Sequence, residues 1–188
     1  MKWNELLSEN CSLARSLAVV GDRWTLLVLR DAFSRVRRFD DFQARLGIAR
    51  RVLAERLAIL ADHGVLEKVA YQERPTRYEY RLTKKGLALY PVILSLVHWG
   101  DAYYAGSEGP PVHHRHNTCG RTFRSVMTCS ECGEALSARD VAIEGYLPPS
   151  SVPLAGHGND SLPPSRVECG SIETGHHLTD GRRKKNRR

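Results

Sequence analysis

A group of cysteine and histidine residues beyond the middle of the chain has the spacing of metal ligands. The pattern H-x2-C-G contains His116 and Cys119, and the pattern C-x2-C-G follows with Cys129 and Cys132. Two close pairs of nitrogen and sulfur donors suit a closed, tetrahedral structural zinc site, and the glycine after each pair relieves the backbone of the turn. We therefore predict a structural zinc ion (Zn) bound by these four side chains.

Two alternatives to this assignment stay open. His113 and His114 compete with His116 for the fourth ligand position, or Cys129 and Cys132 are simply a reduced pair that binds no metal. A catalytic zinc is disfavoured because the sequence lacks an open-site pattern such as H-x-E followed by P-C-x-x-C. We expect that the chain is not an enzyme.

Arg50 and Arg51 are the second pair of residues with recognisable chemistry, because they open a helical segment. Cations oppose the helix dipole in a first turn, so a purely structural choice would favour acids there. Arginine is also the side chain that best binds guanine through two hydrogen bonds. The net charge of +7 favours a polyanionic partner such as DNA. We predict that both arginines contact bases, with two solvated side chains as the alternative.

Two helical segments would position these arginines. Residues 39–46 (FDDFQARL) have a helical pattern that Gly47 breaks, and residues 49–64 (ARRVLAERLAILADHG) form a second helix that ends at Gly64. Two short helices joined by a tight glycine-containing turn are typical of a helix-turn-helix. The side chains of the second helix that we expect in the core are Leu53, Leu57 and Leu60.

The hydrophobic period changes directly after the second helix. Residues 65–72 (VLEKVAYQ) and 77–82 (RYEYRL) alternate apolar and polar side chains around the turn ERPT, which predicts a β-hairpin. Helix, turn, helix and hairpin in this order predict a winged helix-turn-helix over about residues 22–83. A long apolar helix follows, capped by Thr83, and Pro91 is expected to kink or restart it.

The predicted DNA contacts come from the outer face of the second helix, from the wing, and from the first helix with the turn before it. The second helix is expected to lie in the major groove, the wing tip to enter the minor groove or bind phosphate, and the remaining residues to meet backbone phosphates. A solvated hairpin is the alternative for the wing. The predicted contacts are Arg50, Arg51, Ala54, Glu55, Arg74, Thr76, Arg77, Arg37, Arg38, Gln43 and Arg45.

Composition divides the chain into three regions. Residues 1–106 are rich in periodic apolar positions, residues 107–147 contain the cysteine and histidine group, and residues 148–188 are rich in Pro, Gly, Ser and His and end in RRKKNRR. We predict a DNA-binding and dimerisation domain, a small zinc-ribbon-like module and a disordered basic tail, respectively. The expected fold class is mainly α (α+β), and we find no internal repeat.

The amino-terminal segment does not resemble a targeting sequence. Residues 1–17 have the pattern of an amphipathic helix, and no apolar run reaches the ~18 residues of a membrane span. We expect a cytoplasmic, reduced protein without a membrane partner, in which clustered cysteines bind metal rather than form disulfides.

Several runs in the first region are similar to the HxlR family of bacterial, MarR-like winged-helix regulators. They are CSLARSLAVVGDRWTLLVLRDAF, RRFDDFQARLGIARRVLAERLAILADHGVLEK, RYEYRLTKKGLAL and a Trp-Gly pair, in the order and spacing of the family from about residue 11 to residue 100. The resemblance implies a sequence-specific transcriptional regulator, an activator or a repressor, that binds double-stranded DNA. A subset of the family carries a similar carboxy-terminal extension.

The same resemblance implies a homodimer, with the amino-terminal helix and the helix after the wing at its interface. An unknown small-molecule effector would bind between these helices and the DNA-binding part. Ala49 departs from the family pattern, in which Ser caps the recognition helix, and losing such a cap costs about 1 kcal/mol. Cys11 occupies a position at which a cysteine can respond to oxidants in this family. The alternative function is therefore a redox- or metal-responsive sensor in which Cys11 or the zinc module controls DNA binding, and the alternative for Cys11 is a small buried residue at the dimer interface.

Overall fold

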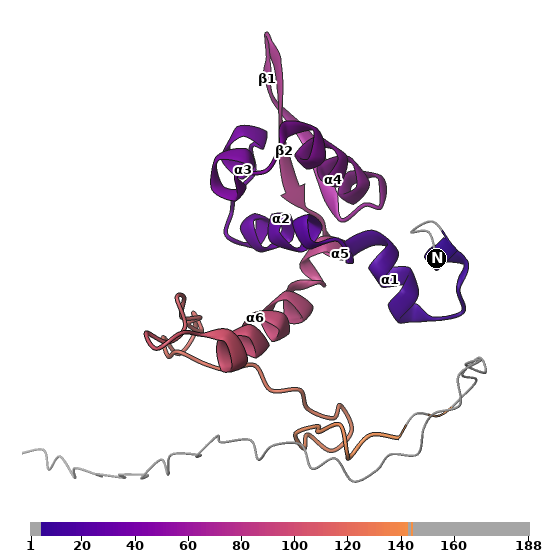
Figure 1. Cartoon of the computed structure of the whole chain (residues 1–188), viewed down its shortest axis with the longest axis vertical. Helices are drawn as coiled ribbons and strands as arrows, with labels where there is room; N and C mark the ends of the chain where they lie inside the picture. The colour runs from indigo at the N-terminus through magenta and orange to yellow at the C-terminus, as the bar shows by residue number, and fades with distance from the viewer. Residues whose placement is uncertain (1–4, 143, 145–188) are drawn as a thin grey trace, which may run out of the picture. The chain divides into compact units, whose positions relative to one another are not determined.

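The described part of the chain, residues 5–142 and residue 144 of the computed structural model, combines helices with one two-stranded antiparallel sheet. This mixed architecture agrees with the predicted α+β fold class, and Figure 1 shows how the elements follow each other. The predicted tail, residues 148–188, lies outside the described residues. The elements are η1 (Glu5–Ser8), α1 (Ser12–Val20), α2 (Arg23–Phe33), α3 (Phe39–Leu46), α4 (Arg50–Asp62), β1 (Leu66–Glu73), β2 (Thr76–Leu82), α5 (Lys84–Leu87) and α6 (Tyr90–Tyr104).

The hydrophobic core lies where α2, α3 and α4 meet the base of the hairpin. Leu29 from α2 and Phe42 from α3 have no exposed surface, and neither do Leu53, Leu57 and Leu60 from α4. Spacings of three and four residues put the three leucines on one helical face, so the predicted inner face of this helix is confirmed. Each such side chain contributes about 1.5–3 kcal/mol when it leaves water.

Asp22 joins the start of α2 to α4. Its Oδ1 accepts hydrogen bonds from the backbone N–H groups of Trp24 and Thr25 at 3.0 and 3.3 Å, so Asp22 caps α2. The same oxygen lies 3.1 Å from Nε of Arg56 on α4, although the two atoms lack the alignment of a hydrogen bond. Only 25% of the Arg56 side chain is exposed, so this arginine is part of the scaffold that holds α4.

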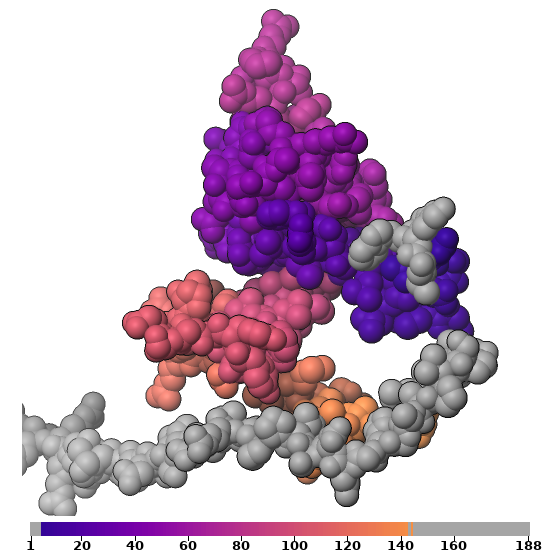
Figure 2. All heavy atoms as spheres, in the orientation of Figure 1, coloured from indigo at the N-terminus to yellow at the C-terminus, as the bar shows by residue number. Residues whose placement is uncertain are grey.

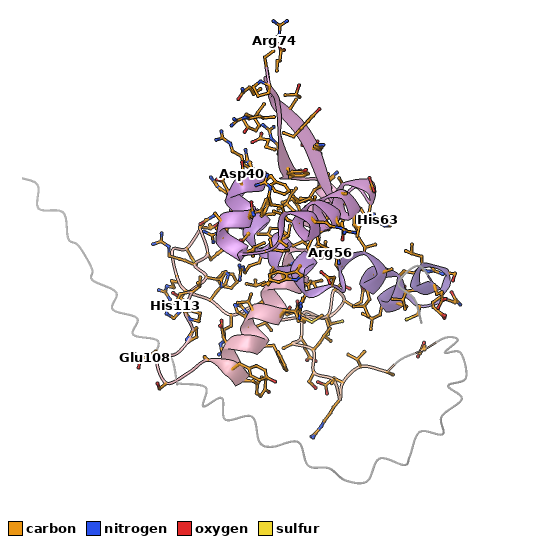
Figure 3. The ribbon with its side chains drawn as sticks, turned by 45° about the horizontal axis from the view of Figure 1, so that its top comes forward. Asp40, Arg56, His63, Arg74, Glu108 and His113 are labelled. Carbon is orange, nitrogen blue, oxygen red and sulfur yellow. The ribbon has the colours of Figure 1, made fainter. Side chains whose placement is uncertain are left out.

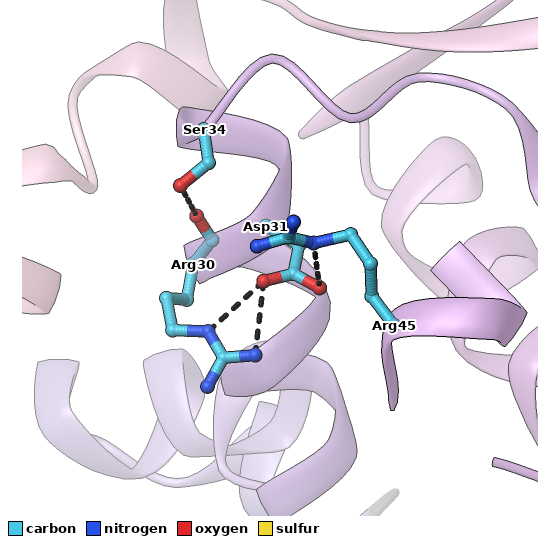
Figure 4. A network of polar contacts seen from close by, with 4 residues as sticks. All are labelled: Arg30, Asp31, Ser34 and Arg45. Atoms are coloured by element: carbon cyan, nitrogen blue, oxygen red, sulfur yellow. Dashed lines mark hydrogen bonds and ion pairs between the residues drawn. The ribbon is translucent and has the colours of Figure 1, made fainter. Parts of the chain in front are cut away.

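A buried carboxylate holds α2 against α3. The Asp31 side chain has no exposed surface, and Arg30 donates to its Oδ1 through Nε at 3.0 Å and approaches it with Nη2 at 2.9 Å. Nε of Arg45, on α3, donates to the other carboxylate oxygen at 3.3 Å, as Figure 4 shows. Two arginines therefore neutralise a charge that would be costly to bury alone.

The hairpin formed by β1 and β2 projects from the helices as a narrow wing (Figures 1 and 2). The strand register pairs Leu66 with Leu82 at the base and Glu73 with Thr76 at the tip. Gly64 follows α4 in the left-handed region, with φ +65°, and turns the chain into β1. The predicted helix, turn, helix and hairpin are all confirmed.

The helix predicted after the wing is divided into α5 and α6. Thr83 accepts the backbone N–H of Gly86 at 3.1 Å and caps α5, and Pro91 lies in the first turn of α6. The chain therefore restarts its helix at this proline. Gly86 packs so closely against the base of the wing that a Cβ there would lie 2.2 Å from the carbonyl oxygen of Val65.

The amino-terminal segment differs from the expected single helix. Within its described part, a 3-10 turn over Glu5–Ser8 is followed by α1, which begins only at Ser12. Cys11 has an extended backbone, with φ −141° and ψ 117°, and this conformation separates the two elements. The prediction of one helix over residues 1–17 is therefore wrong in the residues that the structure describes.

Both α1 and α6 leave large apolar side chains exposed. Leu13 and Leu17 project from α1, and Val92, Leu96 and Trp99 project from α6, with 54% of Trp99 accessible. These side chains recur at three- and four-residue spacing, so α1 and α6 each have an exposed apolar face. No helix among the described residues is both long and apolar enough to cross a bilayer.

The segment after α6 has neither helix nor strand over residues 105–142. Its sheet-like contacts are the two isolated bridges that join Arg115 to Thr122 and Thr128 to Ala135. The strands expected of a zinc-ribbon-like module are therefore not formed in this part of the chain. Each bridge instead closes a short turn that carries one pair of predicted metal ligands.

Candidate nucleic-acid interface and metal-ligand pairs

The outer face of α4 carries the first group of predicted DNA contacts. Arg50, Arg51, Ala54 and Glu55 are all exposed, opposite the buried leucines of the same helix. Ala49 precedes the helix with φ −60° and ψ 135°, and its side chain provides no cap. The first backbone N–H groups of α4 therefore lack the side-chain acceptor that a serine would supply.

Arg50 is held in place by α3. Its Nη1 donates to Oδ1 of Asp40 at 3.0 Å and to Oε1 of Gln43 at 2.7 Å, and its guanidinium lies 4.7 Å from the centre of the Phe39 ring. Both hydrogen bonds use the same nitrogen, Nη1. The N–H groups of Nε and Nη2, on the other edge of the guanidinium, can therefore donate to another partner. The ion pair with Asp40 is exposed, and such pairs contribute only about 0–1 kcal/mol.

Arg51 is the more exposed of the two arginines. Its Nε donates to Glu55 one turn later at 3.1 Å, and 91% of its side chain is accessible. A pair of this kind stabilises a helix by only about 0.2–0.5 kcal/mol and exchanges readily for another acceptor. Arg51 and Glu55 are therefore available on the outer face of the helix.

The wing supplies three of the predicted contacts. Arg74 lies at its tip, as Figure 3 shows. Thr76 donates its hydroxyl to the carbonyl oxygen of Glu73 at 3.0 Å, which closes the turn. Arg77 lines a groove between the wing and α3, together with Arg38 and Arg50. The structure thus brings together three predicted contacts from β2, the start of α3 and the start of α4.

Other predicted contacts have roles within the fold. The guanidinium of Arg38 lies 4.7 Å from the ring centre of Tyr71 and so joins α3 to the wing. Arg37 is exposed, and its carbonyl oxygen accepts the N–H of Tyr80. Gln43 is the acceptor for Arg50, and Arg45 is bound to the buried Asp31.

Sequence reasoning missed two features of this face. Asp40 places a carboxylate beside Arg50, although ten residues separate them and no local pattern joins them. Lys68 extends over the ring of Tyr78, 4.1 Å from its centre, and adds a cation to the wing. For the contact between Lys68 and Tyr78, the sequence offered only the alternation of polar and apolar residues along the two strands.

The predicted metal ligands lie in two pairs. Sγ of Cys119 is 3.5 Å from Nδ1 of His116, and Cys129 contacts Cys132. The backbone N–H of Cys132, and next that of Glu131, donate to the Cys129 sulfur and hold the pKa of its thiol below the ordinary value. Within the described residues, no three His, Cys, Asp or Glu side chains gather closely enough to hold a metal ion, so the two pairs are not joined.

The segment that carries these pairs is attached to α6 through His98. Its Nδ1 accepts the backbone N–H of Ser125 at 3.1 Å and lies 2.9 Å from the Ser125 hydroxyl. The His98 ring also meets the rings of His114 and Phe123 edge-on, with centres 5.7 and 6.2 Å apart. Burial, and then the charge of His114, lower the pKa of His98. The neutral imidazole therefore acts as the acceptor.

Comparison with known proteins identifies relatives that match half or more of this chain. Residues 19–108 match the model of the family described as HxlR-like helix-turn-helix. The HTH-type transcriptional regulator Rv3095 of Mycobacterium tuberculosis is 46% identical over 136 residues, which are 72% of this chain and 86% of that protein. The HTH-type transcriptional regulator YdeP of Bacillus subtilis is 32% identical over 50% of this chain and 75% of its own length.

Solved structures extend the comparison. The crystal structure of the candidate transcription factor PA1607 superposes with a TM-score of 0.68 and 35% identity, over 74% of this chain and 98% of that one. The candidate transcription factor PA1374 from Pseudomonas aeruginosa superposes with a TM-score of 0.52 and 35% identity, over 75% and 96% of the two chains. A continuous match of 136 residues in a chain of 188 necessarily includes residues 53–136, so the similarity to Rv3095 reaches beyond the winged helix into the segment after α6.

Proposed function

Because the chain belongs to the HxlR-like helix-turn-helix family of transcriptional regulators, we propose that it binds specific DNA sequences with α4 in the major groove. The observation that carries this proposal is the groove in which Arg38, Arg50 and Arg77 converge from three elements. Side chains that converge from a helix start and a wing can span a major groove and the phosphates beside it.

Arg50 and Arg51 are the proposed base contacts. They occupy the first turn of α4, which is the part of a recognition helix that lies nearest the bases. Arg50 reaches this position already oriented by Asp40 and Gln43, so less side-chain entropy is lost when it binds a base. Arg74 at the wing tip, with Thr76 and Arg77, is the proposed contact to the minor groove or to phosphate.

The test uses DNA from upstream of the gene that encodes this chain, with a scrambled duplex as the reference. Arg50→Ala and Arg51→Ala should each weaken specific binding by about 5- to 150-fold, the equivalent of one arginine–guanine contact of about 1–3 kcal/mol. Arg139→Ala is the matched control, because Arg139 is exposed in the segment after α6 and lies outside α1, α4, α6 and the wing. Equal affinities of all three variants and the parent protein would show that α4 does not bind the bases.

A homodimer is the second part of the proposal. The exposed apolar side chains of α1 and α6 support it, because a packed interface would remove Leu13, Leu96 and Trp99 from water. Trp99 lies against Tyr103 and Tyr104, with ring centres 5.7 and 5.2 Å apart, and so forms an aromatic cluster of the kind that dominates interface energies.

The mass of the protein in solution tests the dimer. Sedimentation equilibrium should give twice the chain mass of 21.1 kDa, and Leu96→Asp should shift it toward the monomer. Val126→Asp is the control, because Val126 is 67% exposed but lies outside both helices. A monomeric parent protein, or a dimer that survives Leu96→Asp and dissociates with Val126→Asp, would contradict the assignment of the interface.

A redox-responsive form of this regulator is the second candidate. The observation that favours it is Cys11, which is exposed and directly precedes α1, one of the two helices proposed at the interface. In a dimer this thiol has its own copy as a potential partner. Peroxide should then weaken DNA binding by the parent protein and leave Cys11→Ser unchanged. An identical response in both proteins would remove Cys11 from the mechanism.

A further inference from the structure

The two predicted ligand pairs lie on turns with the same backbone hydrogen bonds. In the first turn, the N–H of His116 donates to Arg121 O at 2.9 Å and the N–H of Gly120 donates to His116 O at 2.8 Å. In the second, the N–H of Cys129 donates to Glu134 O at 2.8 Å and the N–H of Gly133 donates to Cys129 O at 2.9 Å. Every donor and acceptor in one turn has its counterpart 13 residues later.

The repeat continues on both sides of each turn. The bridge between Arg115 and Thr122 corresponds to the bridge between Thr128 and Ala135, 13 residues later. Likewise, the hydrogen bond from Phe123 N–H to His114 O, at 3.1 Å, corresponds to the one from Leu136 N–H to Met127 O, at 2.8 Å. The glycines that permit the turns, Gly120 and Gly133, have φ +69° and +76°. The structure therefore contains a 13-residue repeat of backbone contacts, which the sequence alone did not reveal.

The repeat assigns equivalent positions to the four donors. His116 corresponds to Cys129 as the first residue of a turn, and Cys119 corresponds to Cys132 as the fourth. The Cys119 sulfur and the His116 Nδ1 are 3.5 Å apart. Zinc–sulfur and zinc–nitrogen bonds of about 2.3 and 2.0–2.1 Å at a tetrahedral angle place these two atoms about 3.6 Å apart. The first pair thus already has the separation of two ligands of one metal ion.

The segment that carries the turns also lacks a hydrophobic core of its own. No residue from 105 to 142 is buried, and even Phe123 and Cys129 are only half-buried. A chain segment without a hydrophobic core needs a cross-link or a metal to hold its turns together. The exposed donors at the two turns can meet a metal ion from solvent, because Cys119 and Cys132 have accessible side chains.

We propose that these turns are two halves of one structural zinc site, which Zn²⁺ assembles by drawing His116, Cys119, Cys129 and Cys132 into a tetrahedral S₃N set. Each cysteine loses its thiol proton to solvent when it binds, and the imidazole binds as the neutral base. All four positions are then occupied by protein ligands, which makes the site structural, without a place for a reacting water.

The repeat also decides between the three histidines. His113 and His114 precede the first turn, and the counterpart of His114 in the second turn is Met127, which contributes only its backbone. The His114 ring packs edge-on against His98 of α6. His116 alone has a cysteine, Cys129, as its counterpart.

The experiment measures metal in the full, reduced chain without DNA, so its result is independent of the proposed regulatory function. Purified protein should contain about one zinc per chain. The protein reconstituted with Co²⁺ should show the intense visible absorption of a tetrahedral cobalt–thiolate site. Cys119→Ser, Cys129→Ser and Cys132→Ser should each abolish tight binding, and His116→Ala should change the cobalt spectrum and weaken binding by at least 10-fold.

His114→Ala and His113→Ala are the matched controls and should keep the metal, its affinity and the cobalt spectrum of the parent protein. Helical circular dichroism of every variant shows whether the winged helix is intact, so loss of metal is separated from loss of fold. The proposal is overturned by a parent protein that binds no Zn²⁺ or Co²⁺ tightly. It is also overturned by a metal that stays when Cys129 is replaced, or by a spectrum that changes with His114→Ala and not with His116→Ala.

Discussion

Replacing Arg45 tests whether this basic side chain has a structural role or contacts DNA. The sequence predicts that Arg45 contacts phosphate. In the structure, its Nε donates to the fully buried carboxylate of Asp31 at 3.3 Å. Replacing it by alanine removes one of the two cations at that carboxylate and leaves Arg30 in place at 2.9 Å. The two roles predict different results for stability and for DNA binding.

The loss of stability can be bounded from the environment of the pair. Removing one partner of a fully buried ion pair costs about 3–5 kcal/mol. Here the Arg45 side chain is 55% exposed, and Asp31 keeps a second partner, so we expect about 1–3 kcal/mol. In urea unfolding at fixed protein concentration, this corresponds to a midpoint lower by on the order of 1 M. Asp31→Asn should remove most of the cost of Arg45→Ala, because a neutral side chain no longer needs two arginines.

The DNA measurement completes this test. If Arg45 acts through Asp31, the folded Arg45→Ala protein should bind DNA within about threefold of the parent, with the same dependence on salt. A phosphate contact would instead lower the slope of log K against log salt by about 0.9. A reduced slope together with unchanged unfolding in urea would refute the structural role that we assign to Arg45.

Four further changes test other parts of the structure. Asp40→Asn should strengthen DNA binding several-fold at low salt, because it removes a negative charge from the groove that is proposed to face phosphates. Titration of a labelled duplex measures the affinity, and weaker binding would mean that the loss of Arg50 orientation outweighs the loss of repulsion. Gly86→Ala should lower the free energy of unfolding by about 1–3 kcal/mol through a backbone clash, whereas the control Gly100→Ala, in open space on α6, should not. Ala49→Ser should raise the melting temperature by supplying a helix cap of about 1 kcal/mol, and no gain would show that the hydroxyl turns elsewhere. The pKa of His98 lies below its ordinary value of 6.5, so its contact with Ser125 in the segment after α6 should be stable above about pH 6.5 and be lost as pH falls through the lowered pKa. An NMR titration that gives the ring a pKa at or above 6.5 would contradict this.

The winged helix could be predicted because its signals are local. The leucines at three- and four-residue spacing on α4 fix its inner face, and Gly47, with φ +60°, can be recognised as a break from its type alone. The change from helical to alternating period marks the start of the wing. In each case the residues that determine the structure lie within one or two turns of the chain.

The partners of the charged residues could not be predicted in this way. Arg50 meets Asp40 across ten positions and Arg45 meets Asp31 across fourteen, so the contacts depend on how α2, α3 and α4 pack together. The repeat after α6 was missed for another reason. It resides in the hydrogen bonds of the backbone, and only Cys119 with Cys132 and Gly120 with Gly133 are identical in its two copies.

The turns that carry the ligand pairs also bear on how fast a metal could be captured. Each pair is already closed by its own backbone hydrogen bonds, so what is left to close is the loop between Cys119 and Cys129, which are ten positions apart. Closing a loop of this length costs about 2 kcal/mol in entropy and takes only about 10–100 ns. The two ligand pairs would then come together far faster than a metal ion arrives from solution. Loading of this segment would be limited by the supply of free metal and the loss of thiol protons, and it should accelerate as pH rises.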